Sequence, residues 1–240
     1  MLSKSQIKLI KSLYQKKYRV KNSLFLVEGI KGVNEFLNSS FQLENLFATE
    51  QYLQSYNGTK GEIITDEELK KVSQLKSPNE VLAIFKIPEK STIDLNTFSV
   101  VLDGINDPGN LGTIIRMCDW FGVEQLICSK DTVDCFNAKV VQATMGSLAR
   151  VRIVYADLMS FLDKTELPSY VTIMDGKNVY ASQLPEKANL IMGNEAHGVS
   201  SEILEKIEKS LTIPQFGLGK TESLNVATAT AILLSEFKRS

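Results

Sequence analysis

Polar side chains that could bind a ligand are concentrated in three turns of the second half of the chain. The first turn follows a short apolar run and carries Asn106 and Asn110, with Arg116 further along the same stretch. Glycines within this turn allow tight bends and the close approach of another backbone. An arginine among apolar residues suits the capture of a phosphate or carboxylate. It is equally typical of a surface residue that pairs with Asp119 or Glu124.

The second turn comes directly after another apolar run and reads Gly193-Asn-Glu-Ala-His-Gly198. It offers backbone donors and acceptors together with the carboxylate of Glu195. An ordinary turn, in which Ser200 or the next serine caps the following helix, has the same pattern. We expect His197 to face solvent, because no second histidine or cysteine is near enough to share a metal or a proton with it.

The third turn begins at Ile213-Pro214 and ends at Ser223-Leu224-Asn225, where the last helix starts. Serine and asparagine at a helix start are usually N-caps, so neither carries a function alone. The tract Gly219-Lys-Thr221 resembles the end of a phosphate-binding loop, but Pro214 stands where that motif requires a glycine. The glycines of the first turn also lack the spacing of a dinucleotide-binding motif. Neither a nucleotide hydrolase nor a nicotinamide enzyme is predicted.

Alternating strands and helices must position these turns. Apolar strands separated by helices predict a parallel sheet covered on both faces, and such sheets bind ligands beyond the carboxyl ends of their strands. The three turns lie at such ends. The expected strands are 98–102, 123–128, 151–155, 171–174, 190–192 and 211–213. The expected helices are 110–121, 137–149, 158–164 and 224–238.

The first half of the chain predicts a smaller layered α/β unit. A helix is expected over 3–17 on the spacing of its apolar residues, and Asp66 could cap a later helix. The polar stretch 88–96 breaks the periodicity and marks the domain boundary. The expected strands are 23–28, 43–49, 62–65 and 81–87, with helices at 30–38 and 66–74.

Composition narrows the class of protein. The chain has 240 residues, 43% hydrophobic and 23% charged, which is ordinary for a globular protein of one large or two small domains. No apolar run approaches the roughly 18 residues of a membrane span, and the N-terminus lacks the apolar stretch of a signal peptide. We therefore expect a cytoplasmic protein without membrane contact. Three cysteines without a paired motif and a single histidine predict no metal site.

Charge is unevenly distributed along the chain. Residues 1–21 contain no acidic side chain, and the remainder has 20 basic and 28 acidic residues. A basic arm on an acidic body suits contact with a polyanion such as RNA, although a solvated lysine-rich helix face is the simpler interpretation of charge alone. The basic residues of the arm are Lys4, Lys8, Lys11, Lys16, Lys17, Arg19 and Lys21.

Taken together and in this order, the three turns resemble the motifs of the SpoU (TrmH) branch of the SPOUT methyltransferases. The matching residues are Asn106, Asn110, Gly112 and Arg116, then Gly193, Glu195 and Gly198, then Ile213, Pro214, Ser223, Leu224, Asn225 and Val226. This resemblance covers about residues 98–240. More loosely, the segments 17–19 and 25–29 are similar to the opening of the small α/β substrate-binding domain that precedes the catalytic domain in many members.

The resemblance implies an α/β fold with a C-terminal parallel-sheet domain that contains a trefoil knot, preceded by a small α/β/α substrate-binding domain. The expected divisions are a basic helical arm at 1–21, the RNA-binding domain at 22–90 and the methyltransferase domain at 97–240. The cofactor implied is S-adenosylmethionine, and the partners are RNA, with rRNA favoured over tRNA, and a second copy in a homodimer. The residues expected to hold the cofactor are Met192, Gly193, Asn194, Gly198, Ile213 and Leu224.

The activity implied is methylation of a ribose 2′-hydroxyl. Arg116 is expected to act on the reacting ribose and its phosphate. Because a guanidinium stays protonated in proteins, stabilisation of a developing alkoxide suits it better than the role of general base. Glu195 is the alternative proton acceptor, or it orients Arg116, while Asn110, Ser223 and Asn225 hold the hydroxyl and the cofactor. The loop from Gln215 to Glu222 is longer and more polar than the family's usual tract, so its role is open.

Two rival interpretations keep the fold and change the function. A catalytically inert RNA-binding protein would bind RNA without binding the cofactor. A base-nitrogen methyltransferase of the same superfamily would give a product that alkali still cleaves, since only a 2′-O-methyl group blocks that cleavage. A small-molecule α/β enzyme is a more distant alternative and leaves the basic arm unexplained.

Overall fold

The computed structural model describes residues 1–58, 61–89, 91–217 and 223–239. The chain divides into two compact units. The N-terminal unit comprises Met1–Glu89 together with Asp134–Ala149, and the C-terminal unit comprises Lys90–Val133 together with Arg150–Ser240. Within the described ranges, no helix has the length and apolar character needed to cross a lipid bilayer.

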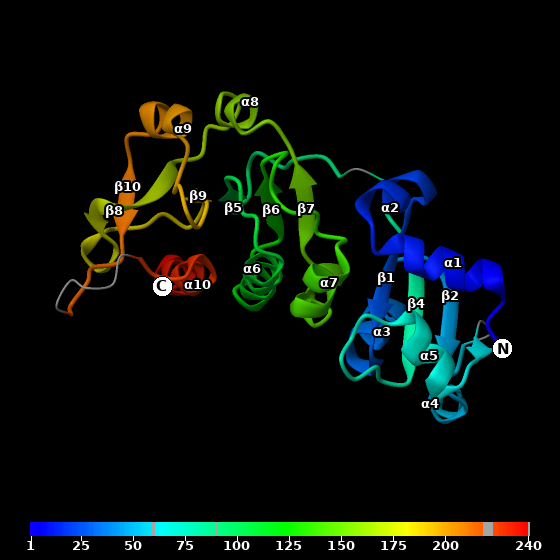
Figure 1. Ribbon diagram of the computed structural model, residues 1–240. Coiled ribbons are helices and arrows are strands. Elements are labelled where there is room, and N and C mark those ends of the chain that lie inside the picture. Colours follow the sequence, from blue (N-terminus) through cyan, green and yellow to red (C-terminus); the bar gives the residue numbers. More distant parts are fainter. Residues whose placement is uncertain (59–60, 90, 218–222, 240) are drawn as a thin grey trace. The chain divides into compact units, whose positions relative to one another are not determined.

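The N-terminal unit is built on a four-stranded sheet in the order β1-β4-β2-β3 (Figure 1). β4 runs antiparallel to both of its neighbours, and the short β3 pairs in parallel with β2. The strands are β1 (Leu24–Glu28), β2 (Leu43–Ala48), β3 (Glu62–Ile63) and β4 (Val81–Lys86). The helices are α1 (Lys4–Leu13), α2 (Lys16–Asn22), α3 (Ile30–Leu37), α4 (Glu50–Ser55), α5 (Asp66–Val72) and α7 (Ala138–Thr144), with a 3-10 turn η1 (Ser147–Ala149).

Alternation along the strands explains why both faces of this sheet are covered. Leu26 and Ile84, paired across β1 and β4, belong to a core that includes Leu13 of α1 and Leu69 of α5. The paired Phe25 and Phe85 are one residue away and therefore point to the other face. There they join an aromatic cluster with Phe36, Phe41 and Phe136. Helices thus lie on both sides of the sheet, as expected for a small α/β/α unit.

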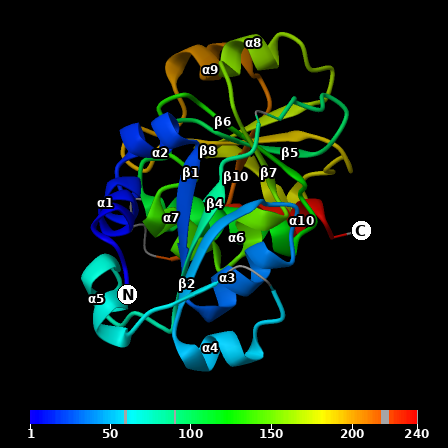
Figure 2. The ribbon, with the colours of Figure 1, turned by 90° about the vertical axis from the view of Figure 1, so that its right-hand side faces the viewer.

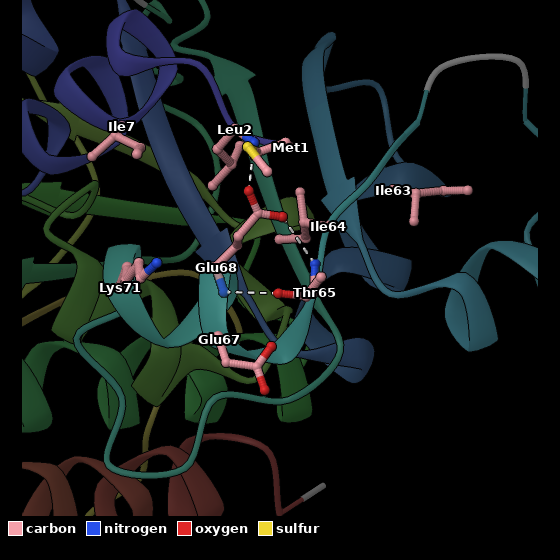
Figure 3. Close-up of a pocket in the computed structure, with 9 residues that line it drawn as sticks. All are labelled: Met1, Leu2, Ile7, Ile63, Ile64, Thr65, Glu67, Glu68 and Lys71. Carbon is pink, nitrogen blue, oxygen red and sulfur yellow. Dashed lines mark hydrogen bonds between the residues drawn. The ribbon is translucent and has the colours of Figure 1, made fainter.

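The start of the chain differs from the expected single helix over 3–17. α1 ends at Leu13 and a separate helix, α2, begins at Lys16. α5 is capped by Thr65 and not by Asp66: the Thr65 hydroxyl accepts from the Glu68 backbone N–H, and the Glu68 carboxylate accepts from the Thr65 backbone N–H. The same carboxylate accepts from the backbone N–H of Leu2 at 2.7 Å, so it also fixes the first residues of the chain (Figure 3).

A buried carboxylate ties three elements of this unit together. Glu28, at the end of β1, accepts hydrogen bonds from the hydroxyls of Tyr14 and Ser73. Burial, with the nearby charge of Glu28, raises the pKa of the Tyr14 phenol, which therefore stays protonated as a donor. The group joins the end of α1, the end of β1 and the residue after α5.

The C-terminal unit contains the predicted parallel sheet, which is confirmed. Its six strands lie in the order β10-β8-β9-β5-β6-β7, and every neighbouring pair is parallel. The strands are β5 (Ser99–Leu102), β6 (Gln125–Cys128), β7 (Arg152–Tyr155), β8 (Ser169–Asn178), β9 (Asn189–Met192) and β10 (Ser210–Thr212). All four residues of each of β5, β6 and β9 are buried, which explains why the last three residues of each strand are apolar.

Helices cover both faces of this sheet (Figure 1, Figure 2). α8 and α9 pack on one face with Val101, Ile127 and Ile191 of the central strands. α6 and α10 pack against each other on the opposite side. The helices are α6 (Pro108–Trp120), α8 (Leu158–Leu162), α9 (Ser201–Lys206) and α10 (Val226–Phe237), with a 3-10 turn η2 (Val179–Ala181).

Three further elements depart from the sequence-based prediction. The helix expected over 137–149 is interrupted at Met145 and Gly146, whose φ angles of 51° and 98° are incompatible with a continuing helix. β8 extends to Asn178, beyond the expected strand. Gly176 within β8 lies so close to β10 that an added Cβ would come within 2.5 Å of the Leu211 carbonyl carbon. The short helix α4 was not predicted.

Candidate active site

The first turn is shaped by the capped start of α6. Asp107 is the N-cap, and its carboxylate accepts from the backbone N–H of Asn110 at 2.8 Å. Pro108 occupies the first helical turn, where its missing N–H costs nothing. Leu111 and Ile115 are buried and anchor the helix on the sheet. Asn110 is therefore presented, half-buried, from a rigid helix start at the carboxyl end of β5.

The second turn is a tight hairpin at the end of β9. Asn194 and Gly198 exchange two backbone hydrogen bonds of 2.8 and 2.9 Å. Gly193 must be glycine here, because a Cβ would lie 2.2 Å from the carbonyl carbon of Gly198. The Asn194 side chain donates to the carbonyl of Gly104 at 2.6 Å and accepts from the backbone N–H of His197. This side chain thereby attaches the second turn to the first.

The third turn reaches the same place through Asn225. As N-cap of α10, its side-chain oxygen accepts from the backbone N–H groups of Ala227 and Thr228. Its side-chain nitrogen donates to the Asn110 side-chain oxygen at 2.9 Å. Asn225, which the sequence predicts to be an ordinary N-cap, thus also forms a hydrogen bond with a residue 115 positions away in the chain.

These contacts form a continuous chain of side chains, Asn225–Asn110–Glu195, which we call the amide–carboxylate relay. Asn110 accepts from Asn225 and donates to the Glu195 carboxylate, each at 2.9 Å. The other carboxylate oxygen has a longer contact of 3.5 Å with the backbone N–H of Asn106. Because each amide is held at both ends, the relay fixes the orientation of its polar groups before any ligand arrives.

Arg116 is not part of the relay in a single chain. Its side chain is exposed and, within the described ranges, has no ion pair or hydrogen bond. Six residues separate it from Asn110, so it points about 120° away around α6. The alternative ion pair with Asp119 is not seen, because Asp119 pairs with Arg150 at 2.8 Å.

The remaining residues of the three turns have simpler surroundings. Ser223 and His197 are exposed, and neither side chain has a described hydrogen bond. Burial raises the pKa of the Cys118 thiol to about 12, so a thiolate nucleophile in α6 is excluded near neutral pH. No cluster of three or more potential metal ligands occurs among the residues that the structure describes. Residues 218–222 of the long loop lie outside the described residues.

Asp103 is a site residue that sequence reasoning missed. It follows β5 directly, and its carboxylate accepts from the backbone N–H of Ser200 at 2.7 Å. This contact fixes the end of the second turn against the first, as Asn194 does at its beginning. Its position at the carboxyl end of a parallel strand was the available signal.

Comparison with known proteins assigns both halves of the chain. Residues 97–235 match the SpoU rRNA methylase family, and residues 4–83 match the MRM3-like substrate binding domain. The chain belongs to the SpoU rRNA methylase family. The resemblance found in the three turns is therefore confirmed.

Relatives of this SpoU protein match it over nearly its whole length. The 23S rRNA (guanosine(2553)-2′-O)-methyltransferase RlmP of Bacillus subtilis is 32% identical over 237 residues, which cover 95% of this chain and 94% of that protein. A protein of the TrmH family from Porphyromonas gingivalis has a similar structure, with a TM-score of 0.91 and 37% identity over 100% of this chain and 99% of that one. An AdoMet-bound rRNA methyltransferase from Sinorhizobium meliloti gives a TM-score of 0.87 and 30% identity over 100% and 97%.

The basic arm of this SpoU protein is divided between exposed and buried side chains. Six lysines are exposed and have no ion pair with a residue that the structure describes: Lys4, Lys8, Lys11, Lys16, Lys17 and Lys21. Arg19 corrects the prediction, since its side chain is only 2% exposed. It donates twice to the Asp134 carboxylate and once to the Leu13 carbonyl. A guanidinium held in this way cannot reach a phosphate.

Proposed function

We propose that this chain is an S-adenosylmethionine-dependent RNA methyltransferase that modifies a ribose 2′-hydroxyl in rRNA. The observation that carries the proposal is the amide–carboxylate relay, which joins one residue from each of the three family turns at the carboxyl end of the sheet. RlmP of Bacillus subtilis, a relative over almost the full chain, bears the name of a guanosine 2′-O-methyltransferase of 23S rRNA. A guanosine of large-subunit rRNA is therefore the proposed target.

The residues around the second and third turns fit the cofactor. Leu224 is an apolar side chain that is 48% exposed at the start of α10. The backbone N–H and carbonyl groups of Leu224 have no hydrogen-bond partner among the described residues. Gly198 adds open space, since a Cβ there would contact nothing within 4 Å. An apolar surface flanked by free backbone donors and acceptors suits an adenine ring.

The cofactor would be held by the backbone of 192–198 together with Ile213 and Leu224. When bound, S-adenosylmethionine supplies an electrophilic methyl group on a positively charged sulfur. The chain must then align the ribose oxygen, and such alignment can contribute about 7–11 kcal/mol to lowering a barrier. The relay supplies fixed polar groups for that purpose. Glu195, at its exposed end, can accept a hydrogen bond from the hydroxyl or take its proton.

Arg116 is assigned to the negative charge that develops on the ribose oxygen. Because it points away from the relay of its own chain, we include a homodimer in the proposal, with Arg116 facing the relay of the second copy. The exposed side of α6 supports this assignment: Trp120, on the same helix, is 83% exposed. Trp120→Glu should give a monomer by light scattering that has lost methyl transfer. If the wild-type protein were monomeric and fully active, the proposed homodimer would be wrong.

We further propose a role for each domain, a knotted C-terminal domain and a cytoplasmic location. Residues 22–90 would form the RNA-binding domain with the arm at 1–21, and residues 97–240 the methyltransferase domain. A deep C-terminal trefoil knot is included because the family resemblance implies it, and an experimental structure with an unthreaded C-terminal segment would exclude it. A cytoplasmic location is included because rRNA is the substrate.

Calorimetry with the purified protein tests the cofactor part of this proposal. S-adenosylmethionine and its demethylated product should both bind, and Gly193→Ala should weaken that binding because the added Cβ would collide with the Gly198 backbone. An inert RNA-binding protein would bind RNA and neither small molecule. Absence of any uptake by the wild type would therefore overturn the proposal in favour of that alternative.

A further inference from the structure

The N-terminal unit contains a cavity with a mixed polar and apolar lining that no function assigned so far uses. Its volume is about 450 Å³, within the roughly 300–1,000 Å³ of small-ligand sites. Its walls come from α3, from α4 and the residues after it, and from the turn before β4. The hollow of similar size in Figure 3 differs in chemistry, since most of its lining is aliphatic, including Leu2, Ile7 and Ile63.

Tyr56 supplies half-buried aromatic surface to this cavity, and the buried ring of Tyr52 packs against it. The rings of Tyr52 and Tyr56 are stacked, with centroids 6.2 Å apart and planes inclined by 24°. Tyr52 is buried and its hydroxyl donates to the Asn34 side-chain oxygen at 2.6 Å, while burial raises its pKa to about 12. Aromatic side chains of this kind are the surfaces on which proteins stack unpaired RNA bases.

Unpaired polar groups line the same cavity. The Asn34 side-chain oxygen is occupied by Tyr52, so its amide nitrogen remains as a donor. The side chains of Asn38, Asn57 and Glu80 have no hydrogen bond or ion pair with a described residue. The cavity therefore offers amide groups and one carboxylate beside an aromatic surface, which is the combination that reads the edge of a base.

Glu80, which lines the cavity, occupies a strained turn. Its φ angle is 51°, in the left-handed region that glycine adopts freely and other residues adopt rarely. The turn is tight: the Val81 N–H donates to the Asn79 carbonyl at 2.6 Å, and the Glu80 carbonyl accepts from the Thr49 N–H at 2.8 Å. A glutamate where glycine would be easier makes Glu80 a candidate for a functional side chain.

We infer that this cavity binds an unpaired guanine base of the RNA substrate, with Tyr56 stacking on the ring and Glu80 accepting from its hydrogen-bonding edge. The inference rests on the proposed function, because it takes RNA to be the substrate. Guanine is the base whose pairing edge carries two adjacent N–H donors, which match the two oxygens of a carboxylate. Adenine presents one amino group beside a ring acceptor, so it would leave a carboxylate oxygen facing a lone pair.

Binding of short RNAs to the full chain tests this inference. The probes are two U-rich oligonucleotides that differ only in a central G or A, and affinity is measured by fluorescence anisotropy. Wild type should prefer the G-containing probe by about tenfold, as for other single-base contacts. Glu80→Gln should reduce this preference to near unity. Tyr56→Ala should weaken both probes, while Tyr56→Phe should bind them like wild type, because the ring remains.

Ile63→Ala is the matched control, since Ile63 is exposed on β3 of the same unit and lines the other hollow. It should leave both affinities unchanged. Equal binding of the two probes by wild type, or a full preference for G in Glu80→Gln, would overturn the inference. Cofactor binding and methyl transfer are measured on the same preparations. If the wild type binds the cofactor and methylates rRNA without preferring G, only the base-binding inference fails. If the wild type prefers G but does not bind the cofactor, only the proposed function fails.

Discussion

The amide–carboxylate relay and the basic arm use polar side chains in opposite ways. In the relay, Asn225, Asn110 and Glu195 are bonded to one another, so their orientations are fixed by the protein. In the arm, six lysines project into solvent without a described ion pair. Fixed groups position a reacting atom, whereas mobile charges attract a polyanion without selecting its sequence. The difference predicts that changes in the relay affect rate and changes in the arm affect affinity.

Arg19 lies in the sequence of the arm but behaves as part of a core. Its charge is neutralised by Asp134, whose segment packs in the same unit through Phe136. Arg19 therefore tests the contrast between exposed and fixed polar groups, because it lies in the basic arm but is held in place by its neighbours.

The largest expected effect on stability comes from Arg19→Met. Removing one member of a buried ion pair costs about 3–5 kcal/mol, since the partner is left without compensation. Asp134 is 16% exposed, so we expect about 3 kcal/mol, measured by urea unfolding. Lys8→Met is the matched control and should change stability by less than about 0.5 kcal/mol. If the Arg19 variant had native stability and weaker RNA binding, Arg19 would contact RNA as the lysines of the arm are proposed to do.

Arg116→Lys tests the proposed role of Arg116 in catalysis. The substitution keeps the charge and loses the planar fork of donors. We expect kcat to fall by about 10²–10³-fold, with KM little changed, as for the loss of a group that stabilises developing charge. Arg239→Lys, an exposed arginine on the same unit, is the control. Methylation at the native rate by Arg116→Lys would show that its assigned role is wrong.

Charge reversal on α1 should affect affinity and leave the rate constant alone. With Lys4, Lys8 and Lys11 changed to glutamate, the slope of log affinity against log salt should become shallower by about 2–3, because three phosphate contacts are lost. Saturating RNA should restore kcat. Lys86→Glu is the control, because Lys86 already pairs with Glu44. An unchanged slope in the triple variant would remove the arm from RNA binding.

The smallest expected effect, from Glu195→Gln, decides what the relay's carboxylate does. Glutamine can still accept from the Asn110 side chain, but it loses the acceptor that faces the Asn106 N–H. If Glu195 only orients Asn110, one hydrogen bond is lost and kcat should fall by roughly fivefold. The same modest decrease is expected if Glu195 accepts a hydrogen bond from the hydroxyl while solvent takes the proton, because the glutamine oxygen can still accept. A decrease of about 10²-fold or more would show instead that the carboxylate takes the ribose proton.

The sheet of the C-terminal unit could be predicted because the signal for each strand lies in a few neighbouring apolar residues. Fully buried strands such as β5 and β9 end in short apolar runs, and parallel topology places the following turns at one edge of the sheet. That reasoning also located Asn110, Glu195 and Asn225. It could not give their hydrogen bonds, which join residues 85 and 115 positions apart.

The errors arose where the deciding partner is distant in sequence. Arg19 was grouped with the lysines because Asp134, its partner, lies 115 residues away. The segment that begins at Asp134 falls among the residues that match the SpoU family, yet it packs with the N-terminal unit through Phe25 and Phe136. Nothing in its composition distinguishes it from the helices that remain on the parallel sheet.

Methyl transfer from labelled S-adenosylmethionine onto undermodified total RNA, followed by alkaline hydrolysis, tests the central claim most directly. The account predicts label in rRNA, within a dinucleotide that resists alkali, because a methylated 2′-oxygen cannot attack the neighbouring phosphate. Asn110→Ala should abolish that product while leaving the RNA affinity unchanged. Label recovered in an alkali-sensitive mononucleotide, as a methylated base would give, would contradict the claim, and so would the absence of transfer by a protein that binds the cofactor.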